Sequence, residues 1–62
     1  MTASQIESYI AGYHRGLNTE YHGEDVLEMF NEWDEGGGDE KGFFEGFNEG
    51  FRDYKSIMAR FA

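Results

Sequence analysis

Glycine residues at four-residue intervals constrain this chain more than any other feature. Gly12 and Gly16 lie in one segment of helical character, and Gly42, Gly46 and Gly50 lie in another. Each glycine inside a helix costs about 0.5–1 kcal/mol relative to alanine, which is a large fraction of the stability of a small domain. Small residues at i and i+4 allow two helix backbones to approach closely. The spacing therefore predicts that the first helix crosses the last helix at these glycines.

The two glycine-containing segments also resemble one another. Residues 9–17 and residues 43–51 share the order aromatic, apolar, x, Gly, aromatic, x, x, Gly, apolar. The functional alternative to an internal crossing is that these glycines form a dimer seam or a groove for a partner helix.

The first helix is predicted over residues 2–17. Thr2 and Gln5 have the spacing of a capping box, and Asn18 is a plausible stop. Apolar side chains recur at helical intervals and define one face, which consists of Ile6, Tyr9, Ile10, Tyr13 and Leu17.

Two further helices follow from the same periodicity. The second is predicted over residues 24–35 and ends at three glycines, whose backbone entropy opposes a continuing helix. The third starts near Asp39, a good N-cap residue, and extends to Phe61. Its apolar face comprises Phe43, Phe44, Phe47, Phe51, Tyr54, Ile57, Met58 and Phe61. The predicted fold is all-α, a compact three-helix domain that covers residues 1–62 as a single unit.

The size and composition limit how such a domain can be stabilised. The chain has 62 residues and no Cys, so neither disulfides nor thiolate zinc sites can stabilise it. Six Phe, four Tyr and one Trp must supply most of the core. No apolar run approaches the roughly 20 residues that span a bilayer, and no signal peptide is recognisable. We therefore expect a soluble, cytoplasmic protein.

Acidic residues outnumber basic residues, and they are concentrated in one region. Thirteen Asp and Glu face five Lys and Arg, which gives a formal net charge of −8. Nine of the carboxylates lie between residues 20 and 40, where there is no Lys or Arg. This charge argues against direct binding to nucleic acid and to anionic membrane surfaces.

The second predicted helix carries much of this acid on one side. On a helical wheel its carboxylates fall within an arc of about 100°, and like charges at i, i+4 destabilise a helix by about 0.2–0.5 kcal/mol per pair. Two interpretations remain open: a solvated face that keeps the protein soluble, or a surface that mimics a nucleic-acid backbone and occupies a cationic groove. The face comprises Glu24, Asp25, Glu28, Glu32 and Glu35. Asp34, Asp39, Glu40, Glu45 and Glu49 extend the candidate partner-binding set.

By its small size, lack of Cys and strong acidity, the whole chain resembles phage-encoded inhibitors that mimic DNA, which include anti-restriction and acidic anti-CRISPR proteins. The resemblance implies a non-enzymatic inhibitor that binds the DNA-recognition surface of a host defence complex. The partner would be a basic nucleic-acid-binding protein, and the location would be the host cytoplasm if a phage encodes the chain. The alternative is a small helical interaction or homodimerisation module that uses the Gly/aromatic face, with the acid only solubilising.

Neither a catalytic set nor a metal or cofactor site is predicted. Residues 34–45 begin with Asp and end with Glu, as an EF-hand loop does, but glycines stand at positions 3 and 5 and Asp39 stands where the motif requires glycine. A plain glycine linker is the better interpretation, with weak divalent binding by Asp34, Asp39 and Glu40 as the alternative.

The remaining candidates are two histidines and one tyrosine. His14 and His22 lack the spacing of a metal-binding pair, so each is predicted to be a surface or packed side chain. Tyr21 is the best candidate for an exposed aromatic that anchors an interface. The alternative is that its ring packs over the open end of the helices.

Overall fold

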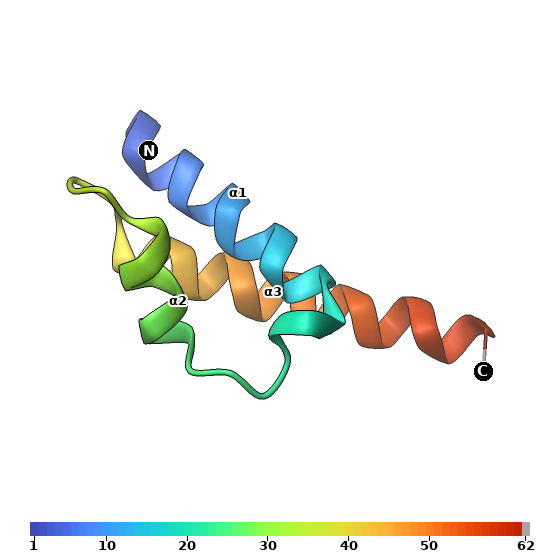
Figure 1. Ribbon diagram of the computed structural model, residues 1–62. Helices are drawn as coiled ribbons and strands as arrows, with labels where there is room; N and C mark the ends of the chain where they lie inside the picture. The colour runs from blue at the N-terminus through green and yellow to red at the C-terminus, as the bar shows by residue number, and fades with distance from the viewer. Residues whose placement is uncertain (62) are drawn as a thin grey trace.

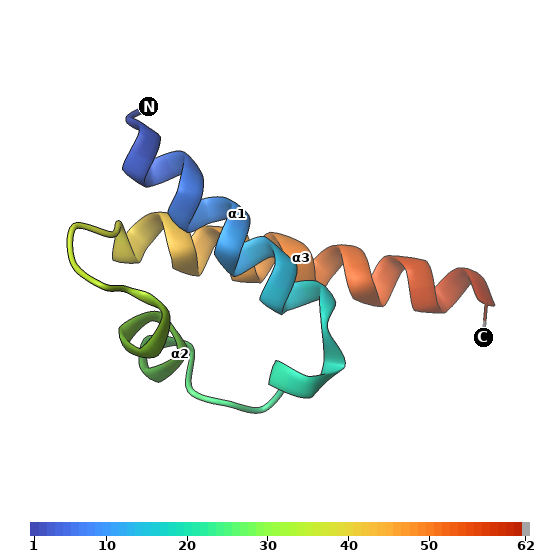
Figure 2. The same ribbon diagram turned by 45° about the horizontal axis from the view of Figure 1, so that its top comes forward.

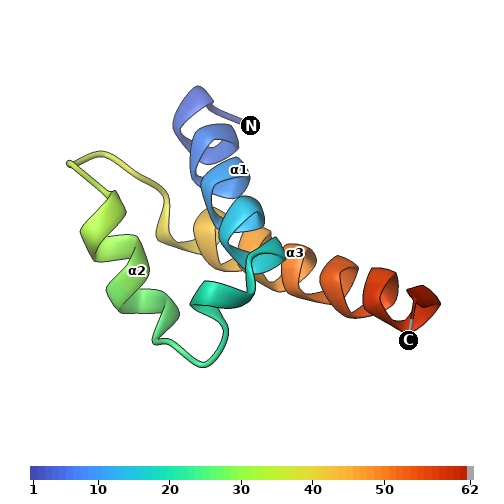
Figure 3. The same cartoon turned by 45° about the vertical axis from the view of Figure 1, so that its right-hand side comes forward.

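The computed structural model describes residues 1–61 as three α-helices and one short 3-10 helix, and it confirms the predicted all-α fold (Figure 1). The elements are α1 (Ala3–Leu17), η1 (Thr19–Tyr21), α2 (Val26–Trp33) and α3 (Glu40–Phe61). No strand occurs in this range. The molecule measures 39 × 23 × 12 Å, and its long dimension follows α3, whose C-terminal turns extend past the other helices (Figure 3).

Both ends of α1 are fixed by the residues that the sequence indicates. The Thr2 amide donates to Gln5 Oε1 at 2.8 Å and the Gln5 amide donates to Thr2 Oγ1 at 3.2 Å, which completes the predicted capping box. At the other end, the backbone of Asn18 is extended and no longer helical. The Asn18 side chain accepts a hydrogen bond from the Glu20 amide at 3.0 Å. Asn18 therefore ends α1 and begins η1.

Helix α2 is shorter than the predicted residues 24–35. Asp25 has an extended backbone and acts as the N-cap, because its carboxylate accepts from the Leu27 amide at 2.9 Å. The backbone of Asp34 is also extended, so the helix ends at Trp33, two residues before the predicted end. The chain then turns through Gly36 and Gly37, whose φ values of 121° and 81° favour glycine.

The predicted crossing of the first and last helices is confirmed, and it is a backbone-to-backbone contact. A Cβ atom on Gly12 would lie 2.1 Å from the carbonyl oxygen of Phe43, and a Cβ on Gly46 would lie 2.1 Å from the carbonyl oxygen of Tyr9. Only a hydrogen atom fits in either place. The Cα–H bonds that point at these oxygens have the geometry of the weak contacts found between closely packed helices.

The glycine contacts advance in the same direction along both helices. One turn further on, a Cβ on Gly16 would lie 2.3 Å from Phe47 O, and a Cβ on Gly50 would lie 2.2 Å from Tyr13 O. The two helices therefore run in the same direction where they cross, as Figure 2 shows. Each contact has a reciprocal partner 34 positions away, so the repeated segments 9–17 and 43–51 face each other about a local two-fold axis.

The aromatic core lies beside the glycine seam and is completed by α2. Phe43 is fully buried, and its ring centroid lies 5.5 Å from that of Phe30 and 5.6 Å from that of Trp33. Met29 and Phe47 complete the buried cluster. The glycines of α3 thus contact α1 through the backbone. The aromatic side chains beside these glycines contact α2.

The apolar face predicted for the first helix is not the buried face. The residues of α1 that are fully buried are small, namely Ser8, Gly12 and Gly16. Ile6 and Ile10 remain exposed to solvent. Close backbone packing explains this result, because the side of α1 that meets α3 has no room for large side chains.

Two polar contacts further connect α1 to α3. The buried Ser8 hydroxyl oxygen accepts from the Asp39 amide at 2.8 Å. The Tyr13 hydroxyl donates to Asp53 Oδ2 at 2.6 Å, and this hydrogen bond, together with desolvation and the charge of Asp53, raises the pKa of Tyr13 above its usual 10.0.

We expect Gly46→Ala to destabilise the fold severely. The added methyl group meets the rigid Tyr9 carbonyl, and overpacking of this kind costs about 1–3 kcal/mol in a chain whose total stability is about 3–9 kcal/mol. Asn48→Ala, at an exposed position of the same helix, is the control and should be neutral or slightly stabilising. Urea unfolding followed by circular dichroism measures both. Equal stability of the two variants would contradict the close seam.

The Tyr13–Asp53 contact predicts a specific pH dependence. Because the folded-state pKa of Tyr13 is raised, its contribution to stability is complete below the unfolded pKa of about 10 and decreases as the pH rises above it. Ultraviolet titration should show a late tyrosine component, which ionises above the usual pKa of about 10. Tyr13→Phe should remove that late component, whereas Tyr21→Phe should retain it.

Candidate acidic interface

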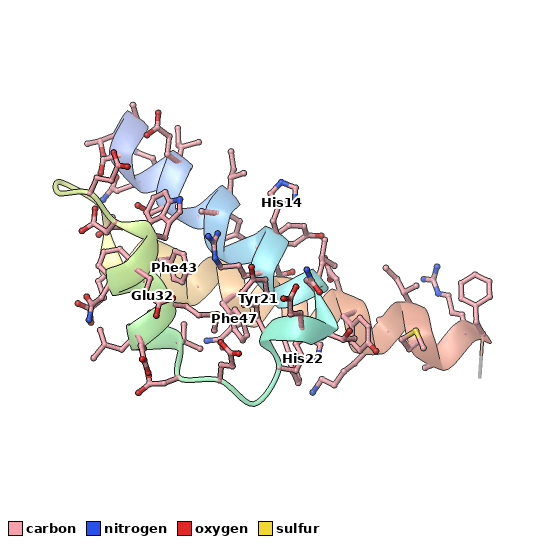
Figure 4. The ribbon with its side chains drawn as sticks, in the orientation of Figure 1. His14, Tyr21, His22, Glu32, Phe43 and Phe47 are labelled. Carbon is pink, nitrogen blue, oxygen red and sulfur yellow. The ribbon has the colours of Figure 1, made fainter. Side chains whose placement is uncertain are left out.

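Four of the predicted site residues gather on one surface of the molecule. Glu24, Asp25, Glu28 and Glu32 line a single hollow, together with the edge of Met29. All four acidic residues are exposed, and Figure 4 labels Glu32 on α2. We call these four residues the α2 acidic row.

The position of the row follows from the packing of α2. Met29 and Phe30 are buried against α3 and fix the inner side of the helix. The i, i+4 spacing then places Glu28 and Glu32 on the same outer side. Asp25 has a second role, because it caps the helix that displays the row.

None of the ion pairs within residues 1–61 involves the α2 acidic row. Lys41 Nζ lies 3.9 Å from Glu45 Oε1, and Arg52 pairs with Glu49 on the exposed side of α3. Glu45 and Glu49 are thus partly neutralised by cations of their own helix. The predicted extension of the acidic surface along α3 therefore has a weaker field than the row on α2.

Arg15 forms no ion pair with the row among residues 1–61. Its guanidinium carbon lies 5.7 Å from the ring centroids of both Tyr21 and Phe43, and one nitrogen donates to Ala11 O at 3.2 Å. Arg15 therefore serves the packing between α1 and the core, a role that the sequence alone did not indicate.

Two predicted site residues act mainly as structural caps. Asp34 Oδ1 accepts from the amides of Gly36 and Gly38, both at 3.0 Å, and shapes the loop between α2 and α3. Asp39 Oδ2 accepts from the Gly42 amide at 2.9 Å and caps α3, as predicted. Both carboxylates are half-buried, so they contribute less to the exposed charge than the row does.

Glu35 and Glu40 are exposed but lie outside the row. Glu35 borders a second hollow, and Glu40 is in the first turn of α3, where a negative charge suits the helix dipole. Sequence reasoning missed Glu7 of α1, which approaches Glu35 only through the tertiary fold. The lining of this second hollow consists of Ser4, Glu7, Ser8, Trp33, Asp34, Glu35, Gly36 and Gly38.

The other candidate side chains are packed or exposed. Tyr21 is half-buried against the core (Figure 4). The ring centroid of His22 lies 4.4 Å from that of Phe51 and 4.8 Å from that of Tyr54. His22 Nε2 lies 2.8 Å from Gly16 O, so this nitrogen carries the proton and donates to the C-terminal end of α1. His14 is exposed.

Among residues 1–61, no three His, Asp or Glu side chains converge closely enough to hold a metal ion. None of the helices in this range combines the length and apolarity of a membrane span. Comparison with known proteins finds no matching family model, no similar curated protein and no similar solved structure.

We expect capping and displayed carboxylates to differ in their effect on stability. Asp25→Ala should lower the free energy of unfolding by about 0.5–2 kcal/mol, because it removes the N-cap of α2. Glu32→Gln should raise it by about 0.2–1 kcal/mol, because Glu32 faces Glu28 and lies near the negative end of the helix. Urea unfolding at low ionic strength measures both. A loss of stability in Glu32→Gln would mean that this carboxylate has a stabilising partner.

Proposed function

We propose that this protein is a non-enzymatic inhibitor whose α2 acidic row occupies the cationic nucleic-acid-binding surface of another protein. The observation that carries the proposal is the row itself. Its four exposed carboxylates border one hollow and lie outside the ion pairs of residues 1–61. Anti-restriction and anti-CRISPR inhibitors that mimic DNA are the functional class that this arrangement resembles.

The charge spacing suits such a partner. Consecutive carboxylates of one helix face are separated by about 6 Å along the axis, so a groove whose Lys and Arg side chains bind successive phosphates also meets successive carboxylates here. The net charge of −8 accelerates encounter with a cationic surface, and the acceleration decreases with salt. Specificity then depends on the fixed positions of the carboxylates on a packed helix.

The cost of the row to the fold supports a functional interpretation. Glu28 and Glu32 repel each other across one turn of an eight-residue helix. Glu32 also lies near the C-terminal end of that helix, where negative charge is unfavourable. A lysine at either position would relieve this repulsion and keep the surface soluble.

The alternative use of the Gly/aromatic face as a docking surface is less well supported. The four seam glycines Gly12, Gly16, Gly46 and Gly50 are buried between α1 and α3. Phe43 and Phe47 of α3 are buried in the core with Met29 and Phe30 of α2. A partner helix could reach the glycine seam or these aromatic side chains only after the domain opened.

Inhibition of DNA binding by purified proteins tests the proposal. The panel comprises a restriction endonuclease, an RNA-guided nuclease complex and a bacterial RNA polymerase, each titrated with labelled duplex DNA in the presence of this protein. For one of these targets we expect displacement of DNA that weakens steeply with added salt. Glu28→Lys with Glu32→Lys should abolish the displacement and retain helix content, because the double change reverses the charge on the face that contacts the groove.

The matched control is Glu7→Lys with Glu20→Lys. It alters the net charge by the same amount at exposed positions outside the α2 acidic row. This variant should retain most of the inhibition. An equal loss of inhibition in the two double variants would show that only overall charge matters. Unchanged inhibition by the Glu28→Lys/Glu32→Lys variant would show that the row is not part of the interface.

A further inference from the structure

The last two described turns of α3 form an exposed arm, in which Lys55 Nζ lies 4.9 Å from the ring centroid of Phe51. Every residue from 55 to 61 is exposed, and the ribbon extends into solvent there (Figure 1). The arm nevertheless has an apolar stripe, because Ile57, Met58 and Phe61 follow the half-buried Tyr54 at i+3, i+4 and i+7. We call residues 55–61 the C-terminal arm.

The C-terminal arm differs from the rest of the chain in charge. It contains Lys55 and Arg60 and no acidic residue, so its formal charge is +2. Residues 1–54 contain all thirteen acidic residues and three Lys or Arg, which gives −10. A cationic amphipathic helix is thus joined to a strongly anionic body, and the two attract each other when they belong to different molecules.

The body has an exposed apolar surface that is complementary to the arm. Met1, Ile6, Tyr9 and Ile10 line a shallow, almost wholly apolar hollow on α1, and we call it the α1 apolar patch. The surroundings of the patch are acidic on balance. Exposed Glu7 lies one helical turn from Ile10 on one side. On the other side, the hollows that Tyr9 borders contain Asp39, Glu45 and Glu49 together with Lys41 and Arg52. Apolar contact and opposite charge therefore occur side by side.

We propose that the C-terminal arm docks on the α1 apolar patch of a second copy of this chain. The arm supplies Ile57, Met58 and Phe61, and the basic residues beside the stripe approach the acidic border of the patch. The inference is independent of the proposed function, because none of the residues of the α2 acidic row belongs to this contact.

The shape of the molecule favours a reciprocal exchange. The arm and the first turn of α1 lie far apart on a body that is 39 Å long (Figure 1). Two copies placed side by side in opposite directions bring each arm to the patch of the other, which is a closed two-fold dimer. Pairing of arm with arm would also bury the apolar stripes, but it would bring together two segments that each have a charge of +2.

Sedimentation equilibrium of the full chain tests the dimer. We expect a dimer that weakens with added salt. Ile57→Ser with Met58→Ser in the arm, and Ile6→Ser with Ile10→Ser in the patch, should each raise the dimer dissociation constant by about tenfold or more, because they remove apolar area from the contact. Leu27→Ser is the control, since Leu27 is 42% exposed and Ile57 is 46% exposed. This control should dimerise as the original protein does.

Cysteine cross-linking provides a second measurement that does not depend on loss of binding. The chain has no Cys, so Ile10→Cys in one preparation and Met58→Cys in another introduce single thiols. The mixture should form mainly the mixed disulfide dimer under mild oxidation. A mainly Met58→Cys homodimer would mean that arm pairs with arm and would overturn the proposal.

Two further results would also overturn it. One is a chain that stays monomeric at concentrations up to about 1 mM. The other is a monomer whose arm instead binds vesicles that contain anionic phospholipid, with binding lost in the Ile57→Ser/Met58→Ser variant.

Discussion

The close approach of α1 and α3 at four glycines determines where the other parts of the molecule lie. Hydrogen atoms alone separate each glycine Cα from a carbonyl of the opposite helix. The seam is therefore stabilised by dispersion and weak Cα–H···O contacts, which are individually small and add up only when the surfaces fit closely. Large apolar side chains have no place in it. Phe43 and Phe47 of α3 lie to one side, in the core that α2 completes, and the isoleucines of α1 lie outside.

The shared direction of α1 and α3 also explains why the acidic side chains lie on the outer side of α2. Two such neighbours cannot be joined by a tight turn, so the chain must return from the end of α1 to the start of α3 before the second helix can begin. Residues 18–39 make this return and contain η1 and α2. The inner side of α2 closes the aromatic core. Its outer side has no packing role, and it is available for charges that a more central helix could not accept.

Local signals in the sequence predicted much of this arrangement. The capping box of Thr2 and Gln5, the N-cap at Asp39 and the glycine spacing depend on neighbouring residues alone, and the structure confirms each. The sequence also placed the four exposed carboxylates of the α2 acidic row on one side, but it did not reveal that Asp34 accepts hydrogen bonds from loop amides. A helical wheel contains no information about such partners.

Other features depend on contacts between distant parts of the chain. The glycine spacing correctly predicted the side of α1 that meets α3. The hydrophobic periodicity of α1 instead identified the most apolar face, where Ile6 and Ile10 remain exposed because the seam selects the face with the smallest side chains. The contacts of Ser8 with Asp39, Tyr13 with Asp53, and Glu7 with the Glu35 hollow connect residues far apart in sequence. No sequence period encodes these pairs.

The same topology has a consequence for how the protein folds. The Tyr13–Asp53 hydrogen bond spans 40 positions of a 62-residue chain, so the seam can form only after a large loop has closed. Loop closure costs entropy before any native contact repays it, and such chains cross their folding barrier more slowly than bundles built from helical hairpins. During that interval the aromatic side chains are exposed to other molecules. Mutual repulsion between strongly anionic chains then keeps the unfinished molecules apart.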